Sequence, residues 1–136
     1  MDYYSNLQTN HRMLVVNQDR EQLALSSTIL AAFDCVYLPL SQADRIVSWV
    51  QEHQPDLIIL NLKLIEAIEL QVITTLRLDW LTRDIPILAI ADASLQSPKS
   101  LDCDAYLNRL HSVSELEQTI CSLVSVSVCP FCGKAA

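Results

Sequence analysis

The stretch Gln54-Pro55-Asp56-Leu57-Ile58-Ile59-Leu60-Asn61-Leu62 decides the fold class of this 136-residue chain. Four apolar residues in a row, set between an acidic residue and an amide, predict a short buried strand. Because no polar side chain interrupts the run, both faces of this strand must be covered, which is typical of a parallel sheet. Asn61 then stands at the carboxyl end of a strand, where open α/β sheets place their functional residues.

Four more apolar runs are predicted to be strands, and segments with helical spacing separate them. The predicted strands are residues 13–16, 35–38, 86–91 and 105–107. The predicted helices cover residues 23–33, a segment from Ser41 to about 53, and residues 65–78. Ser41 is the predicted N-cap of the second of these. A last helix starts at the capping box Ser112-Val113-Ser114-Glu115. Strands that alternate with helices predict a doubly wound, five-stranded parallel sheet of the α/β class.

The amino-acid composition excludes several classes of protein and of binding site. Apolar residues make up 51% of the chain, which excludes a disordered protein, and no apolar run is long enough to span a bilayer. A formal net charge of −7 argues against direct binding of nucleic acid. The single glycine, Gly133, excludes the usual glycine-rich phosphate loops. Five cysteines without a cleavable signal pattern predict reduced thiols and a cytoplasmic location.

Four stretches of the chain resemble the receiver (CheY-like) domains of two-component response regulators. They are residues 13–19, 54–62, 82–91 and 104–109, and the resemblance covers about residues 11–125. It implies a flavodoxin-like fold and a role in phosphorelay signal transduction. We therefore expect a tail over residues 1–11, a receiver-like domain over 12–125, and a second tail over 126–136.

The resemblance also shows what is missing. The family holds Mg²⁺ with two acids after the first strand and phosphorylates an aspartate after the third. A hydroxyl residue after the fourth strand and a lysine after the fifth contact the phosphoryl group. These places here look like Asn17 and Gln18, Asn61, Ala91 and Arg109. Amides carry no charge for Mg²⁺ and are far weaker nucleophiles than a carboxylate. We expect a vestigial pocket with no catalytic residue and no bound Mg²⁺. Asn17 and Asn61 would then bond neighbouring backbone groups, and a role in recognition is the alternative.

The receiver family docks its partners on a face that here would include Tyr106, Arg109 and His111. Tyr106 either packs inward or belongs to this interaction face. The segment between the fourth and fifth strands is about one helical turn shorter than in the family and contains Pro98, so the fourth helix is expected to be short or irregular. Trp49 and Trp80 are expected to pack against the helices rather than to form a binding patch.

The tail carries the motif Cys129-Pro130-Phe131-Cys132-Gly133. Two thiolates at this spacing supply half of a tetrahedral Zn²⁺ site, which a second copy of the chain would complete. A redox pair is a second interpretation, although the motif lacks the helix N-terminus that such pairs normally use. A plain tail is the third. The other cysteines, Cys35, Cys103 and Cys121, are expected in or near the core.

The favoured function is therefore that of a stand-alone, non-enzymatic pseudo-receiver. It would act in two-component-type signalling by protein–protein interaction without phosphorylation. A kinase, a transcription regulator or a second copy of the chain (a homodimer) would be the partner. The alternatives are a zinc-linked or redox-responsive dimer that uses Cys129 and Cys132, and a receiver phosphorylated at a non-standard acid such as Asp19.

Overall fold

The structure is a computed structural model that describes residues 11–17, 31–62, 67–91, 102–108, 112–124, 128–129 and 134–135. The helices and strands are β1 (His11–Asn17), β2 (Phe33–Pro39), the 3-10 helix η1 (Leu40–Arg45), α3 (Ile46–His53), β3 (Leu57–Asn61), α4 (Ala67–Leu78), β4 (Ile87–Ala91), β5 (Ala105–Asn108), α5 (Val113–Leu123), β6 (Val128–Cys129) and β7 (Lys134–Ala135).

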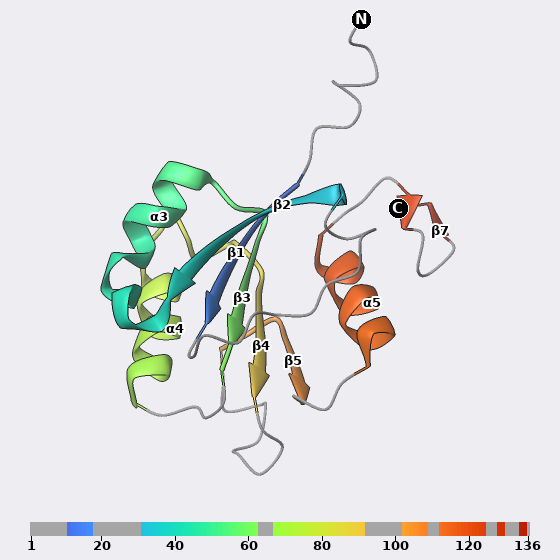
Figure 1. Cartoon of the computed structure of the whole chain (residues 1–136). Helices are drawn as coiled ribbons and strands as arrows, with labels where there is room; N and C mark the ends of the chain where they lie inside the picture. Colours follow the sequence, from blue (N-terminus) through green and yellow to red (C-terminus); the bar gives the residue numbers. More distant parts are fainter. Residues whose placement is uncertain are drawn as a thin grey trace, which may run out of the picture.

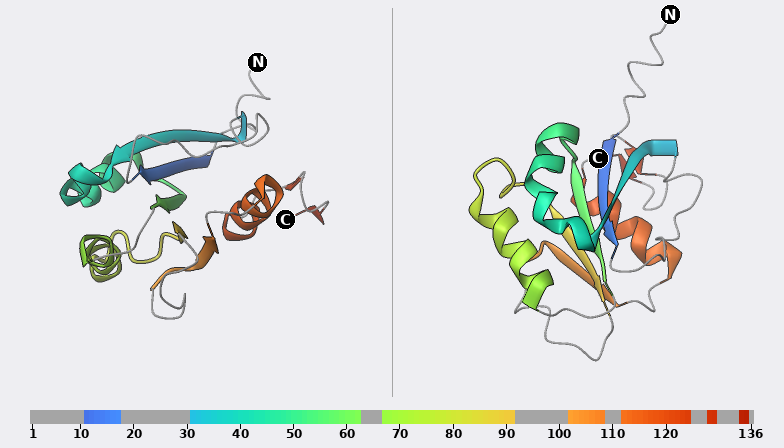
Figure 2. Two further views of the ribbon diagram at one scale, coloured as in Figure 1. Left: turned by 60° about the horizontal axis from the view of Figure 1, so that its bottom comes forward. Right: turned by 60° about the vertical axis from the view of Figure 1, so that its left-hand side comes forward.

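The main sheet has the strand order β2-β1-β3-β4-β5, and every neighbouring pair is parallel. In Figure 1 all five arrows point the same way, α3 and α4 lie on one side of the sheet, and α5 lies on the other. The left panel of Figure 2, turned by 60° from that view, again has α4 and α5 on opposite sides of the sheet. The predicted fold class is confirmed: this is the doubly wound, five-stranded parallel sheet of the flavodoxin-like, CheY-like type.

Two hydrophobic clusters, one on each face of the sheet, form the core. Successive strand residues point to opposite faces, so Leu14 and Val16 join the cluster under α3 and α4, whereas Met13 and Val15 join the cluster under α5. The residues of β3 and β4 alternate in the same way. All five residues of β3 are buried, as are all five of β4. The uninterrupted apolar run that predicted β3 is thus explained by helices on both of its faces.

The last helix begins where the capping box predicts. The Ser112 hydroxyl accepts a hydrogen bond from the Glu115 backbone N–H at 3.0 Å, and the Glu115 carboxylate accepts one from the Ser112 N–H at 3.0 Å. Helix α3 ends at His53, and its C-cap residue Gln54 adopts φ 50° and ψ 60° before Pro55. Proline disfavours the right-handed helical region for the residue before it, so the helix stops there as predicted.

Two local predictions were wrong. Ser41 does not cap a helix: it lies inside η1, whose N-cap is Pro39, and no side chain caps that end. Proline already has a φ near −65°, so the turn starts at Leu40 without help from a hydroxyl. Phe33 is not helical either, because it begins β2 and pairs with His11. The predicted short or irregular fourth helix, including Pro98, lies outside the described residues.

Candidate functional site

The site predicted from the sequence lies at the carboxyl edge of the sheet. Asn17 ends β1 and Asn61 ends β3, and the parallel register sets these two residues directly opposite each other. Ala91 ends β4 opposite Asn108, which ends β5. The fold therefore brings Asn17 and Asn61 together and places Ala91 at the same edge. Gln18 and Arg109 lie outside the described residues.

A direct hydrogen bond joins the two asparagines. The side-chain amide nitrogen of Asn61 donates to the side-chain oxygen of Asn17 at 2.9 Å. Both residues are buried, with exposed fractions of 9% for Asn17 and 7% for Asn61. The expectation that each would bond only to nearby backbone is therefore incomplete, because each also bonds a side chain 44 positions away. Two buried amides that satisfy each other avoid the cost of an unpaired polar group.

The hydrogen-bonded pair of Asn17 and Asn61 determines which chemistry is available at the carboxyl edge of the sheet. An amide oxygen is neutral, so it offers Mg²⁺ none of the charge that carboxylates supply. The lone pair of an amide nitrogen is delocalised into the carbonyl group, so Asn61 is a far weaker nucleophile toward a phosphoryl donor than a carboxylate. Among the described residues, no group of three or more His, Cys, Asp and Glu side chains is arranged to hold a metal ion. The described part of the pocket thus contains hydrogen-bonding groups and no anionic ligand.

Tyr106 lies beside this edge and points inward. Its hydroxyl donates a hydrogen bond to the Ala91 carbonyl oxygen at 3.4 Å, and its ring packs against the cluster under α3 and α4. Ala91 is fully buried, and its methyl group leaves room for the ring. The structure thus shows Tyr106 packed inward, and its place on the interaction face stays a prediction. His111, the other member of the predicted interaction face, lies outside the described residues, as does Arg109.

The cysteine motif coincides with a change of chain direction. β6 and β7 pair antiparallel, with Cys129 opposite Lys134 and Val128 opposite Ala135. The motif Cys129-Pro130-Phe131-Cys132-Gly133 therefore spans the connection between two paired strands. Cys132 itself lies outside the described residues. The remaining cysteines, Cys35, Cys103 and Cys121, are half-buried and form no disulfide.

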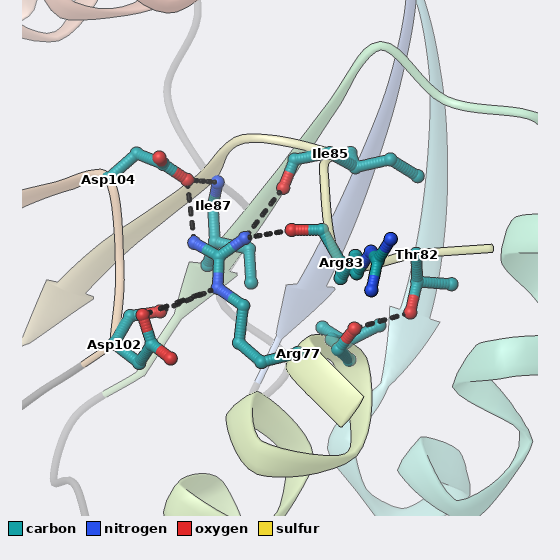
Figure 3. A network of polar contacts seen from close by, with 8 residues as sticks. Arg77, Thr82, Arg83, Ile85, Ile87, Asp102 and Asp104 are labelled. Atoms are coloured by element: carbon teal, nitrogen blue, oxygen red, sulfur yellow. Dashed lines mark hydrogen bonds and ion pairs between the residues drawn. The ribbon is translucent and has the colours of Figure 1, made fainter. Parts of the chain in front are cut away.

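Sequence reasoning missed an arginine at the opposite edge of the sheet. Arg77, in the last turn of α4, donates to the carbonyl oxygens of Asp102, Arg83 and Ile85 at 2.9, 2.8 and 3.2 Å. It also pairs with the Asp104 carboxylate at 2.7 Å. Figure 3 shows its guanidinium at the centre of these contacts. The sequence shows an arginine in the last turn of a predicted helix, but its acceptors come from two separate segments, the turn after α4 and the segment before β5.

The two tryptophans, Trp49 and Trp80, differ in how far they are exposed to solvent. Trp49 is half-buried, packs against the cluster under α3 and α4, and lies with its ring centroid 5.2 Å from that of His53. Its predicted packing is confirmed. Trp80 is 73% exposed, so the prediction that it packs against a helix was wrong. Helix α4 ends at Leu78, and the helical spacing that would place Trp80 on a buried face therefore stops before it.

No helix within the described residues is long and apolar enough to cross a membrane. No family model matches the sequence, and no curated protein does either. Solved structures do match. A response regulator from Desulfuromonas acetoxidans is 18% identical, with a TM-score of 0.65 over 83% of this chain and 95% of that one.

Two other solved structures are similar to this chain over most of its length. The receiver domain of the sensor histidine kinase PA1611 from Pseudomonas aeruginosa, solved with Mg²⁺ coordinated in its active-site cleft, is 16% identical, with a TM-score of 0.63 over 87% of this chain and 100% of that one. The chemotaxis response regulator CheY4 of Vibrio cholerae is 15% identical, with a TM-score of 0.62 over 85% of this chain and 100% of that one. Matches of this kind, with the strand order 2-1-3-4-5, show that the chain has the receiver, CheY-like fold.

Proposed function

We propose that this protein is a pseudo-receiver that acts in two-component-type signal transduction by binding a protein partner without being phosphorylated. The observation that carries the proposal is the hydrogen bond from Asn61 to Asn17, at the position where the receiver family has its phosphorylated aspartate and one of its Mg²⁺ ligands. The scaffold supports the signalling class, and the amide pair supports the loss of the phosphoryl chemistry. No catalytic residue is assigned.

The partner under this proposal is a protein: a kinase, a transcription regulator or a second copy of the chain. The net charge of −7 supports a protein over a nucleic acid. A cytoplasmic location belongs to the same proposal, because Cys35 and Cys103 form no disulfide, and a reducing compartment maintains thiols in that state.

Phosphodonor treatment tests the proposal directly. The full chain is incubated with acetyl phosphate and Mg²⁺, and its intact mass is measured beside that of an active receiver treated identically. We expect the active receiver to gain a phosphoryl group and this protein to gain none. A base-labile phosphoryl group on the wild-type chain overturns the proposal. Peptide mapping then tells whether Asp19 or another acid carries it.

A second candidate function is a zinc-linked dimer, and the pairing of β6 with β7 favours it. That pairing sets the two strands that flank the cysteine motif side by side, which suits a motif that holds a metal at a chain reversal. Cys129 and Cys132 would supply two thiolates, and a second copy would supply the other two of a tetrahedral site. Metal analysis of protein purified without chelator should find about one Zn²⁺ per two chains. The variant Cys129→Ser/Cys132→Ser should lose this zinc; equal zinc in both proteins refutes the assignment.

A further inference from the structure

Three large apolar side chains lie exposed at the end of α4. Leu78 is 79% exposed, Trp80 is 73% exposed and Leu81 is 44% exposed. We call these three residues the Trp80 patch. Single exposed apolar residues are normal on protein surfaces, but three within four positions, one of them a tryptophan, are typical of an interaction site. The patch lies at the opposite edge of the sheet from the asparagine pair.

Several hydrogen bonds hold the segment that carries the patch. The Thr82 hydroxyl, which is fully buried, donates to the Leu76 carbonyl oxygen at 2.5 Å. The Leu81 N–H donates to the Asp79 carboxylate at 2.9 Å. Arg77 holds the carbonyl groups of Arg83 and Ile85 from the other side (Figure 3). A patch presented on a fixed turn loses little conformational entropy on binding, which makes it suited to association.

A pocket of about 270 Å³ shares a wall with the patch. Its lining consists of residues from the end of α3 and from the turn after α4, namely Val50, Gln51, Gln54, Pro55, Leu81 and Ile85. Ligand clefts usually measure about 300–1,000 Å³, so this pocket suits one inserted side chain better than a small molecule. Leu81 belongs both to the exposed patch and to the pocket wall. The exposed Trp80 is therefore the sequence neighbour of a residue that lines a recess.

Charge around the patch favours a second copy of the same chain. The two exposed charged residues of the segment 77–85, Arg83 and Asp84, have opposite signs and cancel, although the whole chain has a net charge of −7. The net negative charge makes two copies repel each other over most of their surfaces, but this repulsion is absent at the patch, where the exposed charges cancel. Arg83 and Asp84 are both exposed, so a two-fold axis can set the arginine of one protomer near the aspartate of the other.

We propose that the Trp80 patch is a two-fold interface between copies of this chain, with Trp80 of each protomer seated in the pocket of its partner. A two-fold contact needs one surface that carries both the protrusion and the recess, and this surface does. The inference goes beyond the proposed function and does not rest on it, because it concerns neither the asparagine pair nor phosphorylation. It names the surface that the expected homodimer would use.

Sedimentation of the full chain tests the proposal, with a chelator present so that the cysteine motif cannot link chains through zinc. Loading concentrations from about 1 μM to about 1 mM cover the range in which modest interfaces dissociate. We expect a concentration-dependent dimer whose dissociation constant rises at least about tenfold in Trp80→Ala, because a central tryptophan is a common hot spot. Val113→Ala is the matched control: Val113 is 49% exposed on α5, away from the patch, and its loss should leave the dimer unchanged.

Fluorescence gives an independent measurement. In the Trp49→Phe variant, Trp80 is the remaining tryptophan, and its emission should shift to the blue as the concentration rises into the dimer range. A chain that stays monomeric throughout overturns the proposal, as does a Trp80→Ala variant that dimerises like the wild type. A blue-shifted Trp80 in a monomer, reversed when residues 127–136 are deleted, also overturns it and assigns the pocket to the chain's own tail.

Discussion

The guanidinium of Arg77 and the carboxylate of Asp104 pair at 2.7 Å across the amino edge of the sheet. The same Asp104 oxygen accepts the Ile87 N–H at 2.8 Å, so one carboxylate fixes both the end of α4 and the start of β4. Arg77 is only 16% exposed at its side chain, whereas Asp104 is 42% exposed. Solvent therefore screens the ion pair itself, and most of the stabilisation comes from the backbone carbonyl groups that Arg77 satisfies.

Replacing Arg77 by alanine should therefore lower the free energy of unfolding by about 2–4 kcal/mol, because the carbonyl groups of Asp102, Arg83 and Ile85 lose a charged donor. Urea unfolding measures the change. Arg45→Ala serves as the control, because Arg45 is exposed in η1 and should change stability by less than about 0.5 kcal/mol. Equal losses for the two variants would show that the Arg77 contacts contribute little.

The asparagine pair should behave as a coupled unit. Asn61→Ala leaves the buried Asn17 amide without its partner and should cost about 1–3 kcal/mol, and Asn17→Ala should cost a similar amount. The double variant should be more stable than the sum of the two losses predicts, by about 1 kcal/mol, because the second removal eliminates no further bond. A double-mutant cycle in urea gives this coupling energy. Strict additivity would mean that the hydrogen bond has no net effect.

The capping box at the start of α5 should stabilise the fold measurably. Ser112→Ala removes the hydroxyl that accepts the Glu115 N–H and should cost about 1 kcal/mol. Ser114→Ala is a fair comparison, because Ser114 is exposed two positions further along, inside the helix, where alanine is the better helix former. Thermal unfolding should place the first variant below the wild type and the second at or above it. The reverse order would refute the cap.

The Cys103 thiol should be unreactive in the folded protein. Burial raises the pKa of Cys103 to about 12, and the nearby Arg77 guanidinium only partly offsets this rise. The thiolate is the reactive form, so alkylation by iodoacetamide at pH 8 should be much slower in buffer than in urea. Between pH 9 and pH 12 the unfolded chain gives up this proton first, so the contribution of Cys103 to stability is complete below pH 9 and declines above it. Equal alkylation rates with and without urea would contradict the burial.

Local patterns predicted the parts of the fold that local forces determine. The run from Leu57 to Leu60 is buried on both sides, and Ser112 caps its helix, because strand burial and capping depend on neighbours in the sequence. Asn61 was placed correctly at a strand end for the same reason. That it bonds Asn17 depends on the register between two strands, which an apolar run does not specify.

The remaining differences arise where distant segments meet. Arg77 has acceptors in the turn after α4 and in the segment before β5, so no short window contains the network. Trp80 was expected to be buried because aromatic residues near helices usually are. The hydrogen bonds that turn the chain at Asp79 and Thr82 instead direct it outward, and those bonds depend on the packed end of α4.

The hydrogen bond between Asn17 and Asn61 bears on how the ends of β1 and β3 are held together. Two carboxylates at these positions would repel each other and push the strand ends apart unless a cation lay between them. Two amides can form a hydrogen bond directly, so the side chains at the ends of β1 and β3 attract each other without a cation between them. We therefore expect the stability of this end of the sheet not to change when divalent ions are removed.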